Sequence, residues 1–304
     1  MTFQVDSVLL KLSPVPIAFA VGYIVQKRQL LNREHAASML KLVVYFGLPV
    51  LIFISIGQME LRADLSLITA TSIIILLLTW PAVTLAGRLL RLDRPTRGSF
   101  VTGPMIMNLS LFYPIVIVAW GTEGFAYLAL FDFGNALVAL SLVHVLSCRY
   151  GADKTDWQDI ALSIIKFPPF IALFLALLVN LNSITLPMPL VTTLKWSGQA
   201  VMLLIPFALG IFLDTRSLFS LPALAAVVLR AGLGFVLALL LVKVFALQGM
   251  IRTIVLFSSL APVGFLALVY ATRHHLDREF AASIASLSLL IAMVYVPLAL
   301  QLLH

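Results

Sequence analysis

Two prolines lie near the middle of long apolar segments, and polar side chains precede each of them. The prolines are Pro114 and Pro262, and the polar residues before them are Asn108, Ser110, Ser258 and Ser259. Because proline lacks an amide hydrogen and clashes with the preceding turn, each helix is expected to break or kink there. The amides freed at the start of a half-helix carry partial positive charge that suits a carboxylate. We interpret these residues as a candidate anion-binding site; the alternative is that the prolines only kink their helices and the serines cap the broken turns.

Two charged residues also lie inside apolar segments, where a charge is costly and is a functional hypothesis by default. Arg230 could hold an anionic substrate, and Asp132 could take up a coupling proton or cation. Asn135 follows Asp132 by about one helical turn and is expected to share its face. The alternative for Arg230 and Asp132 is a buried structural ion pair.

Motifs of enzymes and metalloproteins are missing from the sequence. It has no His-Glu-x-x-His, no glycine-rich phosphate loop and no Gly-x-Ser-x-Gly elbow, so we expect neither enzymatic activity nor a cofactor. We expect no metal-binding partner for the single cysteine, Cys148, and interpret it as a buried structural residue. We interpret His144 as an interfacial side chain and His274 as part of a solvated, charged loop, in preference to a metal site.

The composition is that of a membrane protein. Of the 304 residues, 62% are hydrophobic and only 11% are charged, whereas soluble domains carry about 25% charged residues. The formal net charge is +7, but the Lys and Arg residues lie in short loops without interleaved aromatic residues, so no nucleic-acid partner is expected. The lipid bilayer is the expected solvent.

Ten segments are apolar and long enough to cross a bilayer, which takes about 20 residues each. They are 5–26, 36–58, 65–89, 98–120, 124–147, 160–181, 190–212, 218–242, 249–272 and 280–302. The connections between them are too short for a soluble domain, so the function is expected to reside within the membrane.

Lysine and arginine are distributed unevenly between the two sets of alternate loops. One set holds twelve of these residues and the opposite set only four. Because cytoplasmic loops collect Lys and Arg, the richer set is assigned to the cytoplasm. We therefore expect a multi-pass protein of the plasma membrane, in a bacterial inner membrane, with both termini outside.

A polar stretch divides the ten segments into five and five. With an odd number of spans in each half, the second half enters the membrane in the reverse direction. Corresponding spans of the two halves carry prolines, namely Pro49 with Pro206 and Pro114 with Pro262. Inverted repeats with matched interrupted helices are typical of secondary transporters. The expected organisation is a first repeat at 1–148, a cytoplasmic linker at 149–159 and a second, inverted repeat at 160–304.

Several short motifs resemble those of one known family. They are Gly22-Tyr23, Lys27-Arg28, Leu30-Leu31, Gly47-Leu48-Pro49, Ala261-Pro262, Tyr270-Ala271, Leu276-Asp277, Ala281-Ala282-Ser283, Ser288 and Pro297. Together they resemble the auxin efflux carrier family of secondary transporters, which includes bacterial malonate and malate permeases. The resemblance extends over nearly the whole chain.

This resemblance implies an all-α fold of two inverted five-helix repeats, in which the fourth and ninth helices are broken and cross at Pro114 and Pro262. It also implies a scaffold of helices 1, 2, 6 and 7, often dimeric, beside a mobile bundle of helices 3–5 and 8–10. Arg230 and Asp132 would belong to that bundle. Substrate would bind at the crossing and move with the bundle in an elevator-like motion.

The predicted function is secondary transport of a small organic carboxylate, such as malonate or malate, by alternating access. The expected partners are that anion, the lipid bilayer, a coupling proton or sodium ion, and a second copy of the chain bound through helices 1, 2, 6 and 7. The nearest alternative is a sodium-coupled organic anion symporter of the bile acid transporter type, which would need a cluster of acidic and carbonyl ligands. A channel or a membrane-embedded enzyme is a more distant alternative.

Overall fold

The computed structural model describes residues 13–151, 155–213 and 219–303. Within these ranges the secondary structure is helical, and the β contact that they contain is one isolated antiparallel bridge between Met107 and Val263. The predicted all-α class is therefore confirmed.

Six helices in the described ranges are long and apolar enough to cross a membrane. They are Arg33–Gly57, Leu65–Leu89, Leu109–Gly151, Met188–Phe212, Leu221–Val244 and Arg278–Leu303. A seventh is counted if Trp157–Ile165 and Pro168–Leu181, which meet at a 51° bend, form one span. This number of apolar helices supports the predicted multi-pass membrane protein.

The end of the predicted segment 98–120 and the start of the predicted segment 124–147 share one long helix, α7 (Phe112–Val138). This helix has a non-helical residue, Gly121, at φ 66° and ψ −158°. A positive φ of this size is accessible to glycine without steric cost. The kink therefore falls between the two predicted segments, at the position where the sequence predicts that one ends.

Two further predicted segments are divided or incomplete. Segment 249–272 is divided between α15 (Gly249–Ser259) and α16 (Leu266–Arg273). Segment 5–26 begins in residues outside the described ranges. The ten-span inverted repeat accordingly stays a prediction.

The chain forms two compact units, and each of them draws on both halves of the sequence. Unit 1 contains Met1–Ala63, Ser110–Ala129 and Ile165–Leu213, and unit 2 contains Asp64–Leu109, Leu130–Ile164 and Asp214–His304. In terms of the predicted spans, unit 1 holds spans 1, 2, 6 and 7 with parts of spans 4 and 5. The units thus cut across the predicted repeats, whose boundaries stay a prediction.

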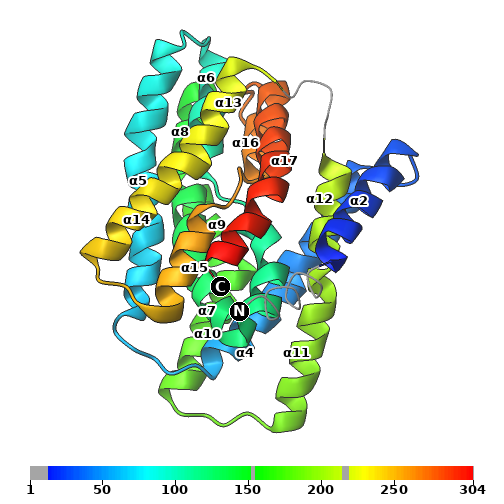
Figure 1. The fold of residues 1–304 in the computed structure, drawn as a ribbon, viewed down its shortest axis with the longest axis vertical. Helices are drawn as coiled ribbons and strands as arrows, with labels where there is room; N and C mark the ends of the chain where they lie inside the picture. The colour runs from blue at the N-terminus through cyan, green and yellow to red at the C-terminus, as the bar shows by residue number, and fades with distance from the viewer. Residues whose placement is uncertain (1–12, 152–154, 214–218, 304) are drawn as a thin grey trace. The chain divides into compact units, whose positions relative to one another are not determined.

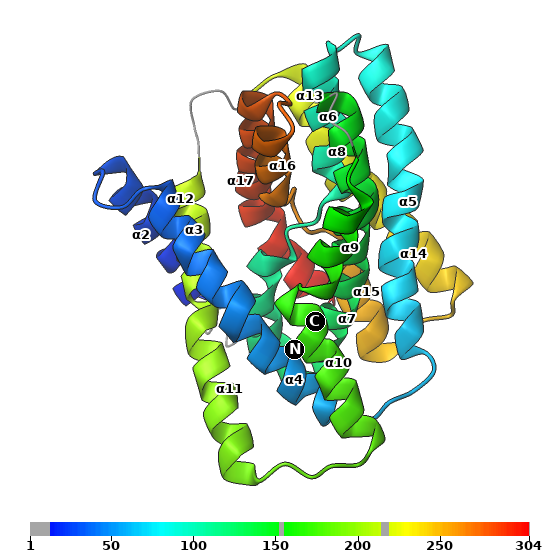
Figure 2. The same cartoon turned by 180° about the vertical axis from the view of Figure 1, so that it is seen from behind.

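Unit 1 is built from helices of both halves. They are α2 (Pro14–Lys27), α3 (Arg33–Leu42), α4 (Leu48–Gly57), the first part of α7, α10 (Pro168–Leu181), α11 (Met188–Met202) and α12 (Leu204–Phe212). Asn32 caps α3, since its side chain accepts hydrogen bonds from the amides of Glu34 at 3.0 Å and His35 at 3.2 Å. A π-helical turn, Val43–Gly47, joins α3 to α4, so that the two run on as one helix (Figure 2).

Helices α2 and α12 of unit 1 lie side by side and touch through two glycines (Figure 1). A Cβ atom at Gly22 would lie 2.1 Å from the carbonyl oxygen of Phe207, and one at Gly210 would lie 2.1 Å from that of Phe19. Both positions therefore require glycine. Small residues permit such close backbone approach between membrane helices, so the Gly22-Tyr23 motif reflects a helix contact.

The carboxyl end of α4 is held by α10. The Nδ2 of Asn180 donates to the carbonyl oxygens of Ile56 at 2.8 Å and Met59 at 2.7 Å. Helix ends leave such carbonyls without partners in the helix itself, so the asparagine satisfies them. On the other side, Gly198 of α11 lies against Leu51 of α4. These contacts fix α4 between α10 and α11.

Unit 2 contains the remaining helices (Figures 1 and 2). They are α5 (Leu65–Leu89), α6 (Arg94–Thr102), the end of α7, α8 (His144–Gly151), α9 (Trp157–Ile165), α13 (Leu221–Val228), α14 (Gly234–Val244), α15, α16 and α17 (Arg278–Leu303). π-helical turns at Ala139–Val143 and Leu229–Leu233 join α7 to α8 and α13 to α14. Such turns are frequent at functional sites, and Arg230 lies in the second of them.

Asp277 ties α17 to α6 in unit 2. Its carboxylate accepts hydrogen bonds from the amide of Phe280 at 2.9 Å and from the hydroxyl of Thr96 at 2.7 Å. Its carbonyl oxygen accepts a further one from the hydroxyl of Ser99 at 2.7 Å. The Leu276-Asp277 motif therefore places a helix cap that also anchors a neighbouring helix.

Two histidines are buried where the sequence predicts exposure. His274 ends α16 and is 5% exposed, and His144 at the start of α8 is also 5% exposed. The backbone turns after α16 at His275, which has φ 55° and is itself exposed. This turn directs His274 into unit 2. The interpretation of His274 as a solvated loop residue and of His144 as an interfacial residue was therefore wrong.

Candidate substrate site

Two helix breaks meet in unit 2. The first is Ile106–Asn108, between the 3₁₀ turn Gly103–Met105 that ends α6 and the 3₁₀ turn Leu109–Leu111 that precedes α7. The second is Leu260–Phe265, between α15 and α16. We call these two segments together the crossover.

The crossover segments pair through their backbones. The amide of Asn108 donates to the carbonyl oxygen of Pro262 at 2.7 Å, and the amide of Gly264 donates to that of Ile106 at 2.8 Å. Met107 and Val263 face each other in the antiparallel bridge between these two bonds. Non-helical backbone at membrane depth is tolerated only where such groups find partners. Each break thus supplies the hydrogen bonds that the other lacks.

Side chains from two other helices complete this pairing. Asn135 of α7 accepts a hydrogen bond from the amide of Met107 at 3.0 Å and donates one to its carbonyl oxygen at 3.3 Å. On the other segment, the hydroxyl of Ser288 in α17 accepts a hydrogen bond from the amide of Val263 at 2.8 Å. The two central residues of the crossover are therefore each held by a polar side chain of a long helix.

Arg230 joins the ends of the two half-helices that lead into the crossover. It is fully buried, and its Nη1 and Nη2 donate to the carbonyl oxygens of Pro104 at 3.2 Å and Ser259 at 3.1 Å. Ser259 ends α15, and Pro104 lies in the turn that ends α6. Because the carboxyl end of a helix carries partial negative charge, one guanidinium compensates two helix ends. Gly234 makes room for it, since a Cβ there would lie 2.3 Å from Nη2.

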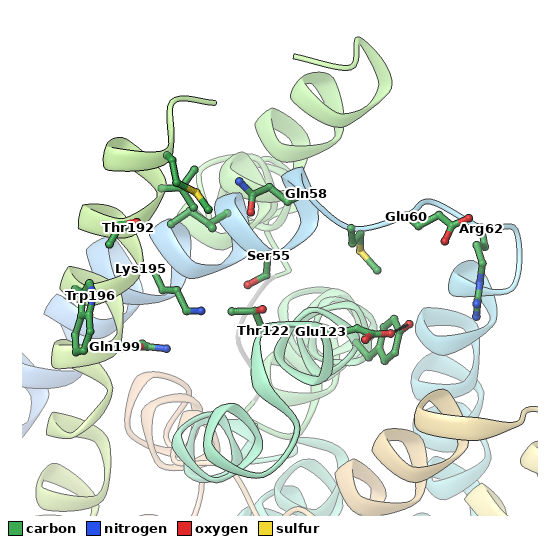
Figure 3. Close-up of a pocket in the computed structure, with 15 residues that line it drawn as sticks. Ser55, Gln58, Glu60, Arg62, Thr122, Glu123, Thr192, Lys195, Trp196 and Gln199 are labelled. Atoms are coloured by element: carbon green, nitrogen blue, oxygen red, sulfur yellow. Dashed lines mark hydrogen bonds between the residues drawn. The ribbon is translucent and has the colours of Figure 1, made fainter. Parts of the chain in front are cut away.

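A cavity of about 820 Å³ lies within unit 1 and is lined by polar side chains (Figure 3). Lys195 of α11 points toward Ser55 of α4 and Thr122 of α7 (Figure 3). The hydroxyl of Ser55 is buried and has no hydrogen-bond partner within the described part of the chain. At another part of the wall, Glu123 accepts a hydrogen bond from the hydroxyl of Tyr127 at 2.6 Å. The volume and the mixed lining are those of a small-molecule pocket.

Comparisons with known proteins place this chain among transporters. The model of a family described as membrane transport protein matches residues 7–156. This is the auxin efflux carrier family, the one that the sequence motifs resemble. The transporter is similar over most of its length to two archaeal proteins. It is 28% identical to an uncharacterized transporter of Methanothermobacter thermautotrophicus, covering 93% of this chain and 94% of the relative. It is 26% identical to an uncharacterized transporter of Methanocaldococcus jannaschii, covering 88% and 90%.

The match to the auxin efflux carrier family confirms the resemblance noted in the sequence. It is also consistent with the expectation that the chain is not an enzyme, since the relatives are transporters by name. The crossover is the feature to which the sequence assigns the substrate site of this transporter.

Four of the predicted site residues of the transporter belong to the crossover or its edges. Asn108 and Pro262 lie in the two breaks, and Ser258 and Ser259 end α15. The hydroxyl of Ser259 donates to the carbonyl oxygen of Leu256 at 2.7 Å. In contrast, Asn108 Nδ2 and Ser258 Oγ are buried without a hydrogen-bond partner among the residues that the structure describes.

Pro114 and Ser110 of the transporter lie outside the crossover. Both belong to unit 1, and Pro114 is the third residue of α7. Proline is tolerated in the first turn of a helix because the amide there has no helical partner. The first break therefore falls at Ile106–Asn108, ahead of the proline to which the sequence analysis assigns it.

Asp132 and Asn135 of the transporter lie together on α7, as their spacing predicts. The Oδ1 of Asp132 accepts a hydrogen bond from Asn135 Nδ2 at 2.8 Å. Since Asn135 also binds Met107, one side chain connects the carboxyl group of Asp132 to the first break.

Sequence reasoning missed the cavity of the transporter. Its lining side chains come from segments far apart in the chain, and most lie close to the ends of the helices. One feature of the sequence does indicate the cavity. Lys195 and Arg62, which both line the cavity, are two of the only four cations in the Lys- and Arg-poor set of loops.

Proposed function

We propose that this protein is a secondary transporter of small organic carboxylates of the malonate or malate kind, with its substrate site at the crossover. One observation carries the proposal. Three buried donors at the crossover have no hydrogen-bond partner within the described ranges, namely Asn108 Nδ2, Ser258 Oγ and Arg230 Nε.

Buried donors without partners are costly and call for an explanation. A carboxylate offers acceptors and a negative charge, so it would satisfy an amide, a hydroxyl and a guanidinium N–H together. Two nitrogens of Arg230 are already engaged by helix ends. Its positive charge would nevertheless attract an anion, and its Nε would supply the direct contact. An uncharged or cationic substrate would gain less from this set of donors.

The cavity of unit 1 supports the same class of substrate. Lys195, Ser55 and Thr122 offer a cation and two hydroxyls to an entering anion, and the carboxylates of Glu60 and Glu123 line another part of the wall (Figure 3). The loops beside it belong to the set that is poor in Lys and Arg, which the sequence assigns to the outside. We propose that the cavity is an outer vestibule and not the transport site itself.

The proposed architecture is two inverted five-helix repeats at 1–148 and 160–304, a scaffold of spans 1, 2, 6 and 7 that dimerises, and a bundle that moves in an elevator-like manner. The protein would lie in a bacterial inner membrane with both termini outside. The matched roles of Asn135 and Ser288, one from each half, support the inverted repeat.

A thermal-shift screen of the purified protein against small carboxylates tests the proposal. A ligand at about 100 times its Kd stabilises a protein by about 2.7 kcal/mol, which raises the Tm by about 5 °C. Asn108→Ala is expected to weaken the best ligand by about tenfold or more, since it removes a donor to a charged group. Lys195→Gln is expected to leave the affinity within about twofold, and exposed Lys243→Gln serves as its control.

Other outcomes of the screen would support a different site or a different substrate. Loss of binding in Lys195→Gln together with normal binding in Asn108→Ala would move the transport site to the cavity. Stabilisation by a carboxylate only in sodium would support the symporter alternative. The absence of any shift with carboxylates would contradict transport of an organic anion.

Asp132 is proposed as the coupling group because Asn135 links it to the first break. Asp132→Asn is expected to reduce uptake into proteoliposomes under an imposed proton gradient to the level seen without a gradient. The exposed Glu279→Gln is a control that should keep the full dependence. Unchanged gradient dependence in Asp132→Asn would make this carboxyl group structural.

A further inference from the structure

Three side chains with metal-binding atoms meet at one end of α8 in unit 2. They are His144 and Cys148, one turn apart on α8, and His274 at the end of α16. One ligand atom from each lies within 4.8 Å of the other two, and the distance from Cys148 Sγ to His274 Nδ1 is 3.7 Å. We call these residues the His-Cys cluster.

The distances in the His-Cys cluster suit a tetrahedral metal ion. Zinc binds thiolate sulfur at about 2.3 Å and imidazole nitrogen at about 2.0 Å, so two such ligands lie about 3.6 Å apart around it. The observed separation of 3.7 Å between sulfur and nitrogen matches this edge. Three protein ligands of this kind leave a fourth position for water. Imidazole and thiolate ligands favour zinc, copper and cobalt over magnesium or calcium.

The surroundings hold the three side chains in place. Gly151 lets the end of α8 approach α16 closely, since a Cβ there would lie 1.9 Å from the carbonyl oxygen of His274. The ring of His144 stacks on that of Tyr270, with centroids 5.3 Å apart, and the Tyr270 hydroxyl donates to the carbonyl oxygen of Ala139 at 3.0 Å. The imidazole of His144 is thus oriented by its neighbours, as metal ligands usually are.

Charge near the His-Cys cluster does not prevent cation binding. Of the two cations next to the cluster in sequence, Arg149 and Arg273, Arg273 forms an ion pair with Asp159 at an exposed position, which directs its charge toward a carboxylate. All three cluster residues are at most 5% exposed. Burial of this kind slows the exchange of a bound ion with bulk solvent.

We propose that His144, Cys148 and His274 bind one transition-metal ion of the zinc class, and that the ion clamps α8 to α16. Binding converts the Cys148 thiol to a thiolate, and the proton passes to the solvent. The clamp joins the helix that follows Asn135 to the half-helix that follows Pro262. It would therefore stiffen unit 2 on both sides of the crossover.

The experiment uses the full-length protein in detergent, purified without a polyhistidine tag and stripped of metal with a chelator. One equivalent of Zn²⁺ is expected to bind and to raise the Tm. Co²⁺ at the same site is expected to show a thiolate-to-cobalt charge-transfer band and the visible bands of tetrahedral cobalt. Cys148→Ser should abolish the charge-transfer band, and His144→Gln should weaken Zn²⁺ binding by at least about tenfold.

The matched control is His275→Asn, which changes the exposed neighbour of His274 and keeps a residue that tolerates a positive φ. It is expected to bind Zn²⁺ like the unaltered protein. The proposal is overturned if the unaltered protein with Co²⁺ shows no thiolate band, or if Cys148→Ser binds Zn²⁺ as tightly as the unaltered protein. The cobalt spectrum of the unaltered protein decides the question even if a variant fails to fold.

Discussion

Arg230→Ala is expected to abolish transport and to lower the Tm by roughly 10 °C. The change leaves the carbonyl oxygens of Pro104 and Ser259 buried without their donors and leaves a void where the guanidinium was. A buried polar group that loses its partner costs about 1–3 kcal/mol, so two of them and the void amount to about 4 kcal/mol or more. Fluorescence-monitored unfolding in detergent measures this loss, and proteoliposome uptake measures transport.

One further variant separates the shape of Arg230 from its charge, and a second serves as a control. Arg230→Lys keeps the charge, but a single ammonium does not reach two carbonyls as a planar fork does, so an intermediate loss of Tm is expected. Arg252→Ala on the exposed face of α15 is the matched control and should change the Tm by less than about 1 °C. A normal Tm in Arg230→Ala would show that the two helix ends do not depend on this side chain.

Asn135→Ala is the second substitution with a large expected effect. It removes both hydrogen bonds to the backbone of Met107 and the one to Asp132. The amide and carbonyl of Met107 would then be buried without side-chain partners, at a cost of about 3 kcal/mol. Ser288→Ala removes only the single bond to Val263, so about half that loss is expected. The unfolding midpoints of the two variants test this ratio of losses, and the exposed Asn182→Ala serves as the control.

The ratio of the stability losses in Asn135→Ala and Ser288→Ala shows how strongly each segment of the crossover is supported. Equal losses in Asn135→Ala and Ser288→Ala would contradict the unequal support that the two segments receive from their long helices. A loss of transport in Asn135→Ala without a loss of stability would instead place Asn135 in the transport cycle itself.

Much of the fold could be predicted from the sequence because apolar length is a local property. Segments of about 20 apolar residues become helices in a bilayer whatever their partners. The position of Pro262 in a break was also predictable, since a proline inside a helix removes a hydrogen bond. The family resemblance followed from short motifs whose residues have structural reasons, as at Gly22, which allows the contact of α2 with α12, and at Asp277, which caps α17.

The first break and the His-Cys cluster could not be predicted from local patterns. The break lies at Met107 because Val263 and Asn135 hold it there, and Val263 is more than 150 residues away in the chain. The cluster was missed because His274 approaches Cys148 only through the close packing of α8 and α16 at Gly151. Arg230 was correctly identified as an unusual residue, but its partners are backbone carbonyls, which a sequence does not mark.

The paired glycines of α2 and α12 have a mechanical consequence. Each glycine rests on a backbone carbonyl of the other helix, so neither helix can rotate about its axis or slide along the other without a collision of main chains. We therefore expect the two helices to move as one rigid body. Any motion within unit 1 must therefore occur outside this helix pair. The π-helical turn at Val43–Gly47, between α3 and α4, is one position that could act as a hinge.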